Sequence, residues 1–547
     1  MSRRAIAIVV ILQFTALITV CLLIGDNGWD DGAITVAFAR TFARYGLVAP
    51  TAYSETVEGF SSVSWFLLNT LAALARPSYH ASILVSQVLS VLCICASTAL
   101  LARTCALLRL DSFFTTLTVL TFVAWGCSFG EASNGMEMGL LAVAFLVTVN
   151  ELLSAQPRRF LLGAGVVLAV TTRFEATLYV ALLALAVVTV PRRRAFWVIV
   201  LACMGAAGLL SVWRLAVFSD VLPNTFWAKR WAPYPALDLV GRLTGAVELP
   251  SLFLVPLIAL AILWRSGFDV AGALQARRRT LLILACPILG AVVVGGMTGS
   301  QWGYKGRMPY FAFPLALALF SLVFSSWVNA GRSKLRIAVA AGSCLVSLTM
   351  SMTGFPSGAL AAAFHGDTFG VSPHAYAETG RVFRRFAVAA ELQHPAILTP
   401  DLGGLSLCCD EFRLVDLGML ANRRLAHRGQ AALAEVLETE SPELVEAHWR
   451  WASAGKLYEL PYFRSHYAPA FAGGTKLWIR RDVAKAIESK GRGCWVAVSR
   501  GEVAEALRGH RYADHDLPED RQSFASSGVV FMLDQVGPST ANPCEVN

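Results

Sequence analysis

Residues 5–24 read AIAIVVILQFTALITVCLLI, a run without charge that is followed at once by the polar stretch GDNGWDDG at 25–32. Similar apolar blocks of roughly 15 to 22 residues recur through the first two thirds of the chain, and this length crosses about 30 Å of hydrocarbon. Of the 547 residues, 56% are hydrophobic and 15% are charged, with a mean hydropathy of +0.56. A soluble domain has about 25% charged residues. The sequence therefore predicts a polytopic α-helical membrane protein.

The apolar blocks predict about 11 transmembrane helices. We place them at 5–24, 80–101, 112–129, 136–153, 160–172, 174–190, 195–217, 250–264, 280–297, 309–328 and 336–353. The first block follows Arg3 and Arg4 and has no small-residue cleavage site after it, which favours an uncleaved first helix over a signal peptide.

Arginine-rich loops alternate with loops that contain little positive charge. By the positive-inside rule, this alternation predicts a cytoplasmic N-terminus and an extracytoplasmic C-terminal segment. It requires that 61–78 lies on the outer face as an amphipathic or re-entrant helix. In the alternative, 61–78 crosses the membrane, and 160–172 merges with 174–190.

The composition changes near residue 354, where the long apolar blocks stop. We predict a transmembrane module at 1–353, with its first outer loop at 25–79, and an extracytoplasmic α/β domain at 354–547. Strands are expected at 396–399, 412–416 and 476–480 with a helix at 428–439, whereas 500–547 looks polar and loosely organised. The net charge of +9 does not indicate nucleic-acid binding, because the arginines lie in small groups between apolar blocks.

Most of the twelve cysteines lie in or near apolar blocks, where a thiol behaves as a small hydrophobe. The other four lie in the predicted outer domain, where disulfides can form. These are Cys408, Cys409, Cys494 and Cys544. Adjacent cysteines rarely pair with each other. No spacing resembles a zinc site. The sequence leaves open whether the protein uses a divalent metal as a cofactor.

Asp30 and Asp31 follow the first apolar block and are the candidates for catalysis. A carboxylate at the mouth of a cavity accepts the proton of an attacking hydroxyl, and repulsion between two adjacent aspartates raises the pKa of one of them. One of the pair then serves as base and the other as a structural group. The alternative is that both favour the start of the helix that follows them.

The predicted outer loops contain further polar residues, and ionisable groups at membrane level tend to mark a site. We take these as substrate-binding candidates: Glu58, Glu137, Arg173, Glu175, Asn224, Lys229, Lys305 and Arg307. The basic residues among them can bind phosphate oxygens by charge-assisted hydrogen bonds, and Asn224 can add a neutral hydrogen-bond donor. Helix capping is the alternative for the glutamates, and extension toward lipid headgroups is the alternative for the basic residues.

Several of these segments resemble GT-C fold membrane glycosyltransferases, above all the terminal arabinofuranosyltransferases of mycobacterial-type cell walls. The resemblance covers roughly residues 25–310, through WDDGAITVAFARTFARYGLV at 29–48, ETVEGFSS at 55–62, Gly135-Met136-Glu137, Arg173-Phe174-Glu175, Pro223–Lys229 and Gly306-Arg307. That family often has Arg-Pro-Glu where this chain has Arg173-Phe174-Glu175, and the C-terminal domain is shorter here. The resemblance therefore supports the fold of this chain more strongly than the identity of its donor sugar.

The resemblance implies a polyprenyl-phosphate sugar donor, with arabinofuranose favoured, and inverting transfer with an Asp base. The acceptor would be a glycan, lipid or protein at the periplasmic face of a bacterial inner membrane. The absence of a phosphate-binding loop or dinucleotide motif agrees with a donor that is not a soluble nucleotide. Two alternatives stay open: a lipid-linked substrate transporter or flippase, and a related transferase for mannose, aminoarabinose or a phospholipid group. A transporter more often has internal repeats and charges near the bilayer midplane, which we do not find.

Overall fold

The computed structural model describes residues 1–188, 193–231, 239–251, 277–298, 306–329, 355–447, 449–472, 475–497 and 529–533, together with the single positions 342 and 352. Most of the predicted helices at 250–264 and 336–353 lie outside the described residues, as do Lys305 and Cys544.

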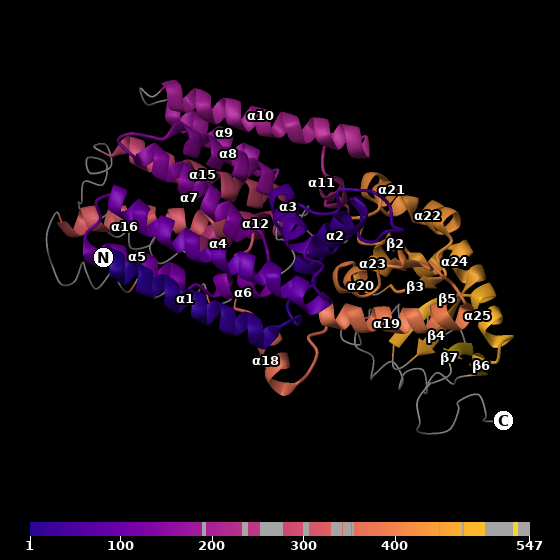
Figure 1. Ribbon diagram of the computed structural model, residues 1–547. Helices are drawn as coiled ribbons and strands as arrows, with labels where there is room; N and C mark the ends of the chain where they lie inside the picture. The colour runs from indigo at the N-terminus through magenta and orange to yellow at the C-terminus, as the bar shows by residue number, and fades with distance from the viewer. Residues whose placement is uncertain are drawn as a thin grey trace.

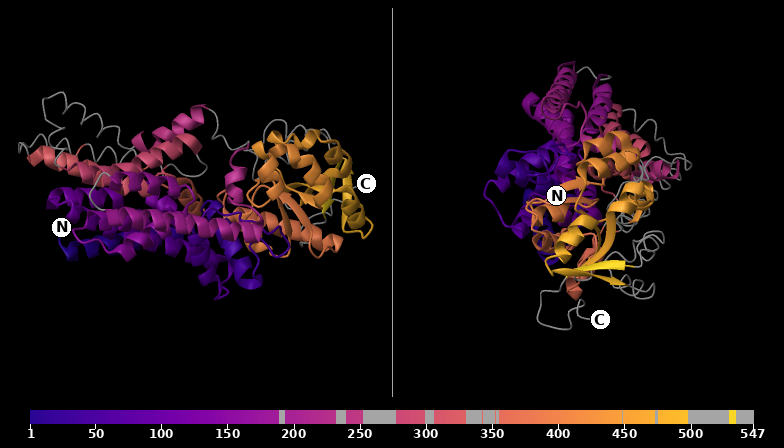
Figure 2. Two further views of the ribbon diagram at one scale, coloured as in Figure 1. Left: turned by 90° about the horizontal axis from the view of Figure 1, so that it is seen from above. Right: turned by 90° about the vertical axis from the view of Figure 1, so that its right-hand side faces the viewer.

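The N-terminal part of the chain is a bundle of apolar helices (Figures 1 and 2). Within the described residues, 4 helices are long and apolar enough to cross a membrane: α1 (Arg3–Ile24), α4 (Tyr79–Leu107), α10 (Arg193–Phe218) and α15 (Arg278–Thr298). Shorter apolar helices pack between them, namely α7 (Met138–Leu153), α8 (Arg159–Thr172), α9 (Ala176–Val188) and α16 (Phe313–Asn329). The protein is therefore a multi-pass membrane protein.

The predicted helix at 112–129 is wrong as a single element. The structure has α5 (Ser112–Val123) and α6 (Gly126–Asn134), which meet at a bend of 43°. The break lies at Trp125, whose backbone is extended and whose ring stacks on Tyr310 and Phe313 with centroids 4.7 and 3.9 Å apart. This aromatic packing fixes the chain in a non-helical conformation there, and α6 carries its polar residues into the interior.

The segment 61–78 forms one short helix, α3 (Val63–Ala73), of 11 residues. At 1.5 Å per residue it is about 16 Å long, roughly half of the hydrocarbon thickness. That 61–78 lies on the outer face stays a prediction. It packs against α2 (Asp31–Tyr45), the helix that the paired aspartates precede.

Among the residues described, the C-terminal part contains a seven-stranded mixed sheet with the order β2-β1-β3-β5-β4-β7-β6. Its strands are β1 (Ala396–Thr399), β2 (Arg413–Asp416), β3 (Leu444–Val445), β4 (Tyr467–Ala472), β5 (Thr475–Arg480), β6 (Gly493–Ala497) and β7 (Val529–Leu533). The parallel neighbours of β1 are β2 and β3, whereas β4 and β5 form an antiparallel hairpin. The expected α/β character of this domain is confirmed, with β1, β2 and β5 close to their predicted bounds.

Short helices connect and flank these strands (Figure 1). They are α19 (Pro373–Ala390), α20 (Gly403–Cys408), α21 (Arg423–Arg428), α22 (Leu433–Glu440), α23 (Trp449–Ala454), α24 (Pro461–His466) and α25 (Arg481–Glu488). The helix before them, α18 (Ser357–His365), contacts α1 of the bundle instead. The predicted helix at 428–439 corresponds to a 3-10 turn at Gly429–Ala432 followed by α22.

Two sequence expectations for this domain need correction. The stretch 500–547 is not uniformly irregular, because β7 pairs with both β4 and β6, and its apolar residues Val530 and Phe531 are fully buried. The adjacent Cys408 and Cys409 are joined by a disulfide. Helix α20 ends at Cys408, and both sulfur atoms face Gly380 of α19, which leaves room for them because it has no side chain. Cys494 is also disulfide-bonded.

The segment 25–79 shares a hydrophobic core with the sheet domain. Phe38 of α2 and the nearby Phe60 and Phe66 belong to the same buried cluster as Phe383 and Leu405. Figure 1 shows α2 and α11 (Asn224–Ala228) between the helical bundle and the sheet domain. The segment that carries Asp30 and Asp31 is thus held between the two parts of the molecule.

Candidate active site

Asp30 points toward the sheet domain. Its side-chain oxygens accept hydrogen bonds from the backbone N–H groups of Gly403 and Gly404 at 2.8 and 2.7 Å, at the start of α20. The residue is only 8% exposed. Burial raises the pKa of Asp30 to about 7, and the charge of Asp31 adds to this, although the two backbone hydrogen bonds lower it. Both oxygens of Asp30 are therefore engaged in attaching the sheet domain.

Asp31 points the other way, toward the helical bundle. It is the first residue of α2, and its side chain is 43% exposed. Its carboxylate lies 2.5 Å from the guanidinium of Arg307. The preceding Gly306 has φ +86 and donates its N–H to Glu248 at 2.5 Å, which fixes the turn that presents Arg307. Of the two aspartates, Asp31 is the one that a ligand can reach.

Arg173 lies at the centre of a buried ion-pair cluster. It sits between α8 and α9, where α8 ends at Thr172 and the backbone becomes extended. Its guanidinium contacts Glu137 at 2.8 Å and Glu175 at 2.6 Å, and only 3% of its side chain is exposed. A charge buried this deeply needs such partners. The cluster fixes the loops that precede α7 and α9 against each other.

Lys229 follows α11 and lies within electrostatic reach of this cluster. Burial and the positive charges of Arg173 and Arg307 lower the pKa of Lys229 to about 8, against the raising effect of Glu175 and Glu137. For Glu175, burial acts to raise the pKa, but the charges of Arg173 and Lys229 bring it below the ordinary value. Lys229 therefore changes its charge near physiological pH.

Glu58 forms a second buried pair, and its partner is a residue that the sequence analysis missed. Arg214 of α10 donates two hydrogen bonds to the two carboxylate oxygens of Glu58, at 2.6 and 2.8 Å. Its guanidinium also lies 5.9 Å from the ring centroid of Phe174. A single arginine inside the apolar stretch SVWRLAVF was the available signal, because such a charge requires a partner.

Asn224 lies outside this cluster of charges. Its amide donates to the backbone carbonyls of Met419 and Leu420 at 3.0 and 2.7 Å, and the residue is buried. These contacts attach α11 to the sheet domain, and the role of Asn224 as a donor to the substrate stays a prediction.

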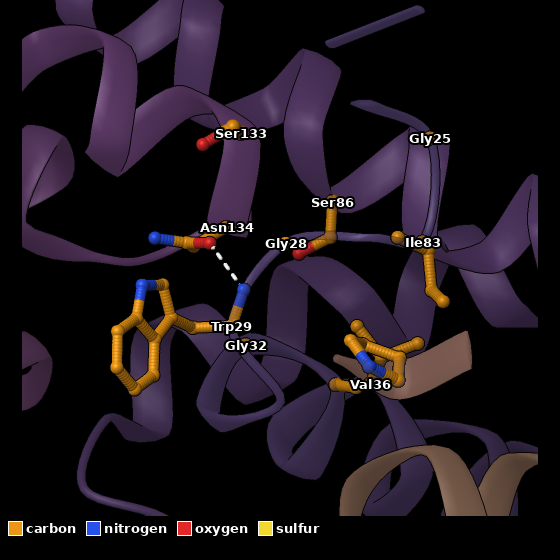
Figure 3. A pocket seen from close by; sticks show the side chains of 11 residues that line it. Gly25, Gly28, Trp29, Gly32, Val36, Ile83, Ser86, Ser133 and Asn134 are labelled. Atoms are coloured by element: carbon orange, nitrogen blue, oxygen red, sulfur yellow. Dashed lines mark hydrogen bonds between the residues drawn. The ribbon is translucent and has the colours of Figure 1, made fainter. Parts of the chain in front are cut away.

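The glycines before and after the aspartates allow close packing against the end of α6. A Cβ at Gly32 would lie 1.8 Å from the carbonyl oxygen of Asn134, and one at Gly28 would lie 2.7 Å from that of Ser133. The backbone N–H of Trp29 donates to Oδ1 of Asn134 at 2.6 Å (Figure 3). The Trp-Asp-Asp-Gly motif therefore needs its glycine for backbone contact, apart from any chemistry.

The structure brings together Asp31, Arg307, Glu137, Arg173, Glu175 and Lys229, and places Asp30, Asn224 and Glu58 in contacts around them. In the described part of the chain, no group of three or more His, Cys, Asp or Glu side chains is arranged to hold a metal ion. The cluster offers the carboxylates of Asp31 and Glu175, whose side chains are 43% and 24% exposed, beside three cationic side chains. It can accept a proton from a hydroxyl and stabilise an anionic leaving group.

No family model matches this chain, and no curated protein matches it in sequence. Among solved structures, it is similar to ArnT from Cupriavidus metallidurans in the apo state, with a TM-score of 0.45 and 13% sequence identity. The match covers 80% of this chain and 92% of the ArnT chain.

Proposed function

We propose that the protein is a membrane glycosyltransferase that moves a sugar from a polyprenyl-phosphate donor to an acceptor of the cell envelope at the periplasmic face. The observation that carries this proposal is the Asp31–Arg307 pair, with a contact of 2.5 Å and an Asp31 side chain that is 43% exposed. An accessible carboxylate next to a guanidinium suits a reaction that needs both a base and a phosphate-binding group.

In this reaction Asp31 takes the proton of the acceptor hydroxyl. The hydroxyl oxygen forms a bond to the anomeric carbon while the bond between that carbon and the phosphate oxygen breaks. The electron pair of that bond leaves with the lipid phosphate. A single displacement inverts the anomeric configuration.

Asp31 suits the base role better than Asp30 for a geometric reason. A base must reach the proton that it removes, at a heavy-atom distance of about 2.6 to 3.2 Å. Both oxygens of Asp30 already accept backbone hydrogen bonds in a buried position, so a substrate would have to displace the sheet domain to reach them.

Arg307 and Lys229 are the residues that would bind the phosphate of the donor. Positive groups aimed at the leaving oxygen stabilise the charge that develops on it in the transition state. Arg173 is bound on two sides by Glu137 and Glu175, so its role is to hold the cluster and to add to its positive potential. When the donor binds, its phosphate would replace Asp31 as the ion-pair partner of Arg307. The carboxylate of Asp31 would then be free to act as the base.

Arabinofuranose is our first choice of sugar, because the sequence motifs resemble arabinan-building enzymes, and mannose is the second. The experiment uses the purified full-length chain in proteoliposomes with synthetic farnesyl-phosphoryl arabinofuranose or mannose and a methyl oligosaccharide acceptor. We expect a new glycoside of inverted configuration together with one free farnesyl phosphate per transfer. Movement of an intact glycosyl lipid across the bilayer without release of farnesyl phosphate would contradict the proposal and favour a transporter.

A further inference from the structure

The turn that presents Arg307 is held from more than one side. Gly306 has φ +86, and a Cβ there would lie 3.1 Å from the ring of Trp125 and 3.2 Å from Sγ of Cys127. The backbone of the turn therefore packs closely against the bend between α5 and α6, where a glycine fits and a larger residue does not. On the other side, Asp31 pairs with the guanidinium of Arg307 at 2.5 Å. The proposed reaction breaks this second contact, because the phosphate of the donor takes the place of Asp31.

After Asp31 has been displaced, the turn depends on its other contacts. Within the described residues, Arg173 donates from a terminal nitrogen to Sδ of Met308 at 3.6 Å. Oε1 of Glu248 accepts the backbone N–H of Gly306 at 2.5 Å. A thioether sulfur is a weak acceptor, whereas a hydrogen bond to a carboxylate is assisted by its charge. Glu248 therefore makes the stronger of these two contacts.

Glu248 belongs to α12 (Leu239–Ser251), the helix that packs against α15. A Cβ at Gly295 of α15 would lie 2.3 Å from the carbonyl oxygen of Gly245, so the backbones of the two helices touch there. Small residues allow such close approach between helices of a membrane protein. Glu248 follows Gly245 by three residues and is the one acidic residue in the sequence of α12. The contact between the two helices thus fixes the place of its carboxylate.

We propose that Glu248 is a positioning residue for Arg307 in the transfer reaction. By accepting the N–H of Gly306, it holds the turn so that the guanidinium stays directed at the donor phosphate once Asp31 has left. This inference rests on the proposed function and deepens it, because it assigns a residue that supports phosphate binding through the backbone. The contribution of Glu248 should therefore appear in the affinity for a lipid phosphate, and it should vanish when Arg307 is removed.

The test measures binding of farnesyl phosphate to the detergent-purified full-length chain. Glu248→Leu removes the acceptor of the Gly306 N–H, whereas Glu248→Gln keeps an acceptor oxygen without the charge. Thr244→Val is the matched control, because Thr244 lies one turn earlier on α12, is exposed, and donates to the carbonyl of Val240 at 2.8 Å. Glu248→Leu is also combined with Arg307→Leu. Thermal unfolding of each variant verifies that it folds.

We expect Glu248→Leu to weaken the affinity for farnesyl phosphate by about tenfold, the effect of one lost charge-assisted hydrogen bond. Glu248→Gln should lose about threefold or less, and Thr244→Val should bind like the wild type. In the Arg307→Leu background, Glu248→Leu should have no further effect, because the two residues act as one unit. With saturating donor, the KM for the oligosaccharide acceptor should be the same in Glu248→Leu as in the wild type.

An unchanged affinity of Glu248→Leu for farnesyl phosphate would overturn the positioning role. A Glu248→Gln variant that binds as weakly as Glu248→Leu would also overturn it, as would an equal further loss in the Arg307→Leu background. A raised acceptor KM in Glu248→Leu would show a general distortion of the site instead. The proposed function fails separately, if the wild type releases no farnesyl phosphate from a farnesyl-phosphoryl sugar.

Discussion

The polar residues on the two sides of the Asp30–Asp31 dipeptide make different kinds of contact. On the side of the sheet domain, Asp30 and Asn224 bond to backbone groups of Gly403, Gly404, Met419 and Leu420. On the side of the helical bundle, Asp31 pairs with the side chain of Arg307, and Arg173 pairs with Glu137 and Glu175.

This difference distinguishes residues that hold the sheet domain in place from residues that can take part in the reaction. A carboxylate that receives two backbone N–H groups holds two chain segments together, and a ligand cannot take its place without opening the fold. An ion pair between side chains, one of them half-exposed, can exchange a partner for a substrate group.

On the side of the helical bundle, Arg307 should determine the rate of sugar transfer. We expect Arg307→Leu to lower the rate of sugar transfer by about 10²- to 10³-fold, because it removes a donor aimed at the developing phosphate charge. Arg307→Lys keeps the charge but not the planar fork, so its loss should be smaller. The measurement is kcat with a farnesyl-phosphoryl sugar. A near-normal kcat for Arg307→Leu would show that the phosphate binds elsewhere.

The Glu58–Arg214 pair should control stability. Arg214→Leu leaves Glu58 buried without its partner, and we expect the free energy of unfolding to fall by about 3–5 kcal/mol. Burial already raises the pKa of Glu58, an effect that Arg214 opposes. The loss should therefore grow as the pH rises above the ordinary pKa of glutamate, since the folded state then holds an unpaired charge. Unfolding in detergent at several pH values tests this.

The matched control for this pair is the double variant Glu58→Leu with Arg214→Leu. It removes both charges, and we expect it to be more stable than Arg214→Leu alone. An equal or lower stability of the double variant would mean that packing around Arg214, and not the ion pair, determines the effect.

The sheet-domain side should respond to Asp30→Asn by weaker attachment of that domain. An amide presents one N–H group to the backbone donors of α20, so one hydrogen bond is lost, at a cost of about 1–3 kcal/mol. Limited proteolysis between the bundle and the sheet domain, together with thermal unfolding, measures this. Wild-type resistance and stability would argue against Asp30 as an attachment point.

Lys229 should give donor binding a pH dependence. Its pKa of about 8 means that it is charged below this pH and neutral above it. The KM for the lipid-phosphate donor should therefore rise by up to about tenfold between pH 7 and pH 9, roughly 1.4 kcal/mol of lost interaction. Lys229→Arg, which stays charged throughout, should give a flat profile. A profile in Lys229→Arg that matches the wild type would assign the pH effect to another group.

Much of the fold could be predicted because it depends on local patterns. Long apolar runs marked the positions of α1, α4, α10 and α15, and short apolar strands between turns marked β1, β2 and β5. The break at Trp125 was not predictable, because no proline or charged residue lies between 112 and 130 and the stacking partner Tyr310 is distant in sequence. Strand β7 was overlooked because it is a short apolar run within a long polar stretch.

The candidate site could be predicted in part for a related reason. Charges in loops next to apolar helices stand out in the sequence, and the structure brings five of these candidates together around Arg173. The separate roles of Asp30 and Asn224 were hidden, because their partners are backbone groups of residues near the other end of the chain. Backbone groups carry no signal in the sequence, so attachment and catalysis look alike there.

The most direct test compares single-turnover sugar transfer by Asp31→Asn and Asp30→Asn in the same proteoliposome preparation. We expect Asp31→Asn to lower the transfer rate by about 10²- to 10⁴-fold with unchanged thermal stability, because only the base is lost. Asp30→Asn should retain most of the rate and lose stability. A wild-type rate for Asp31→Asn, or an equal collapse of the rate in a stably folded Asp30→Asn, would contradict the assignment of Asp31 as the base.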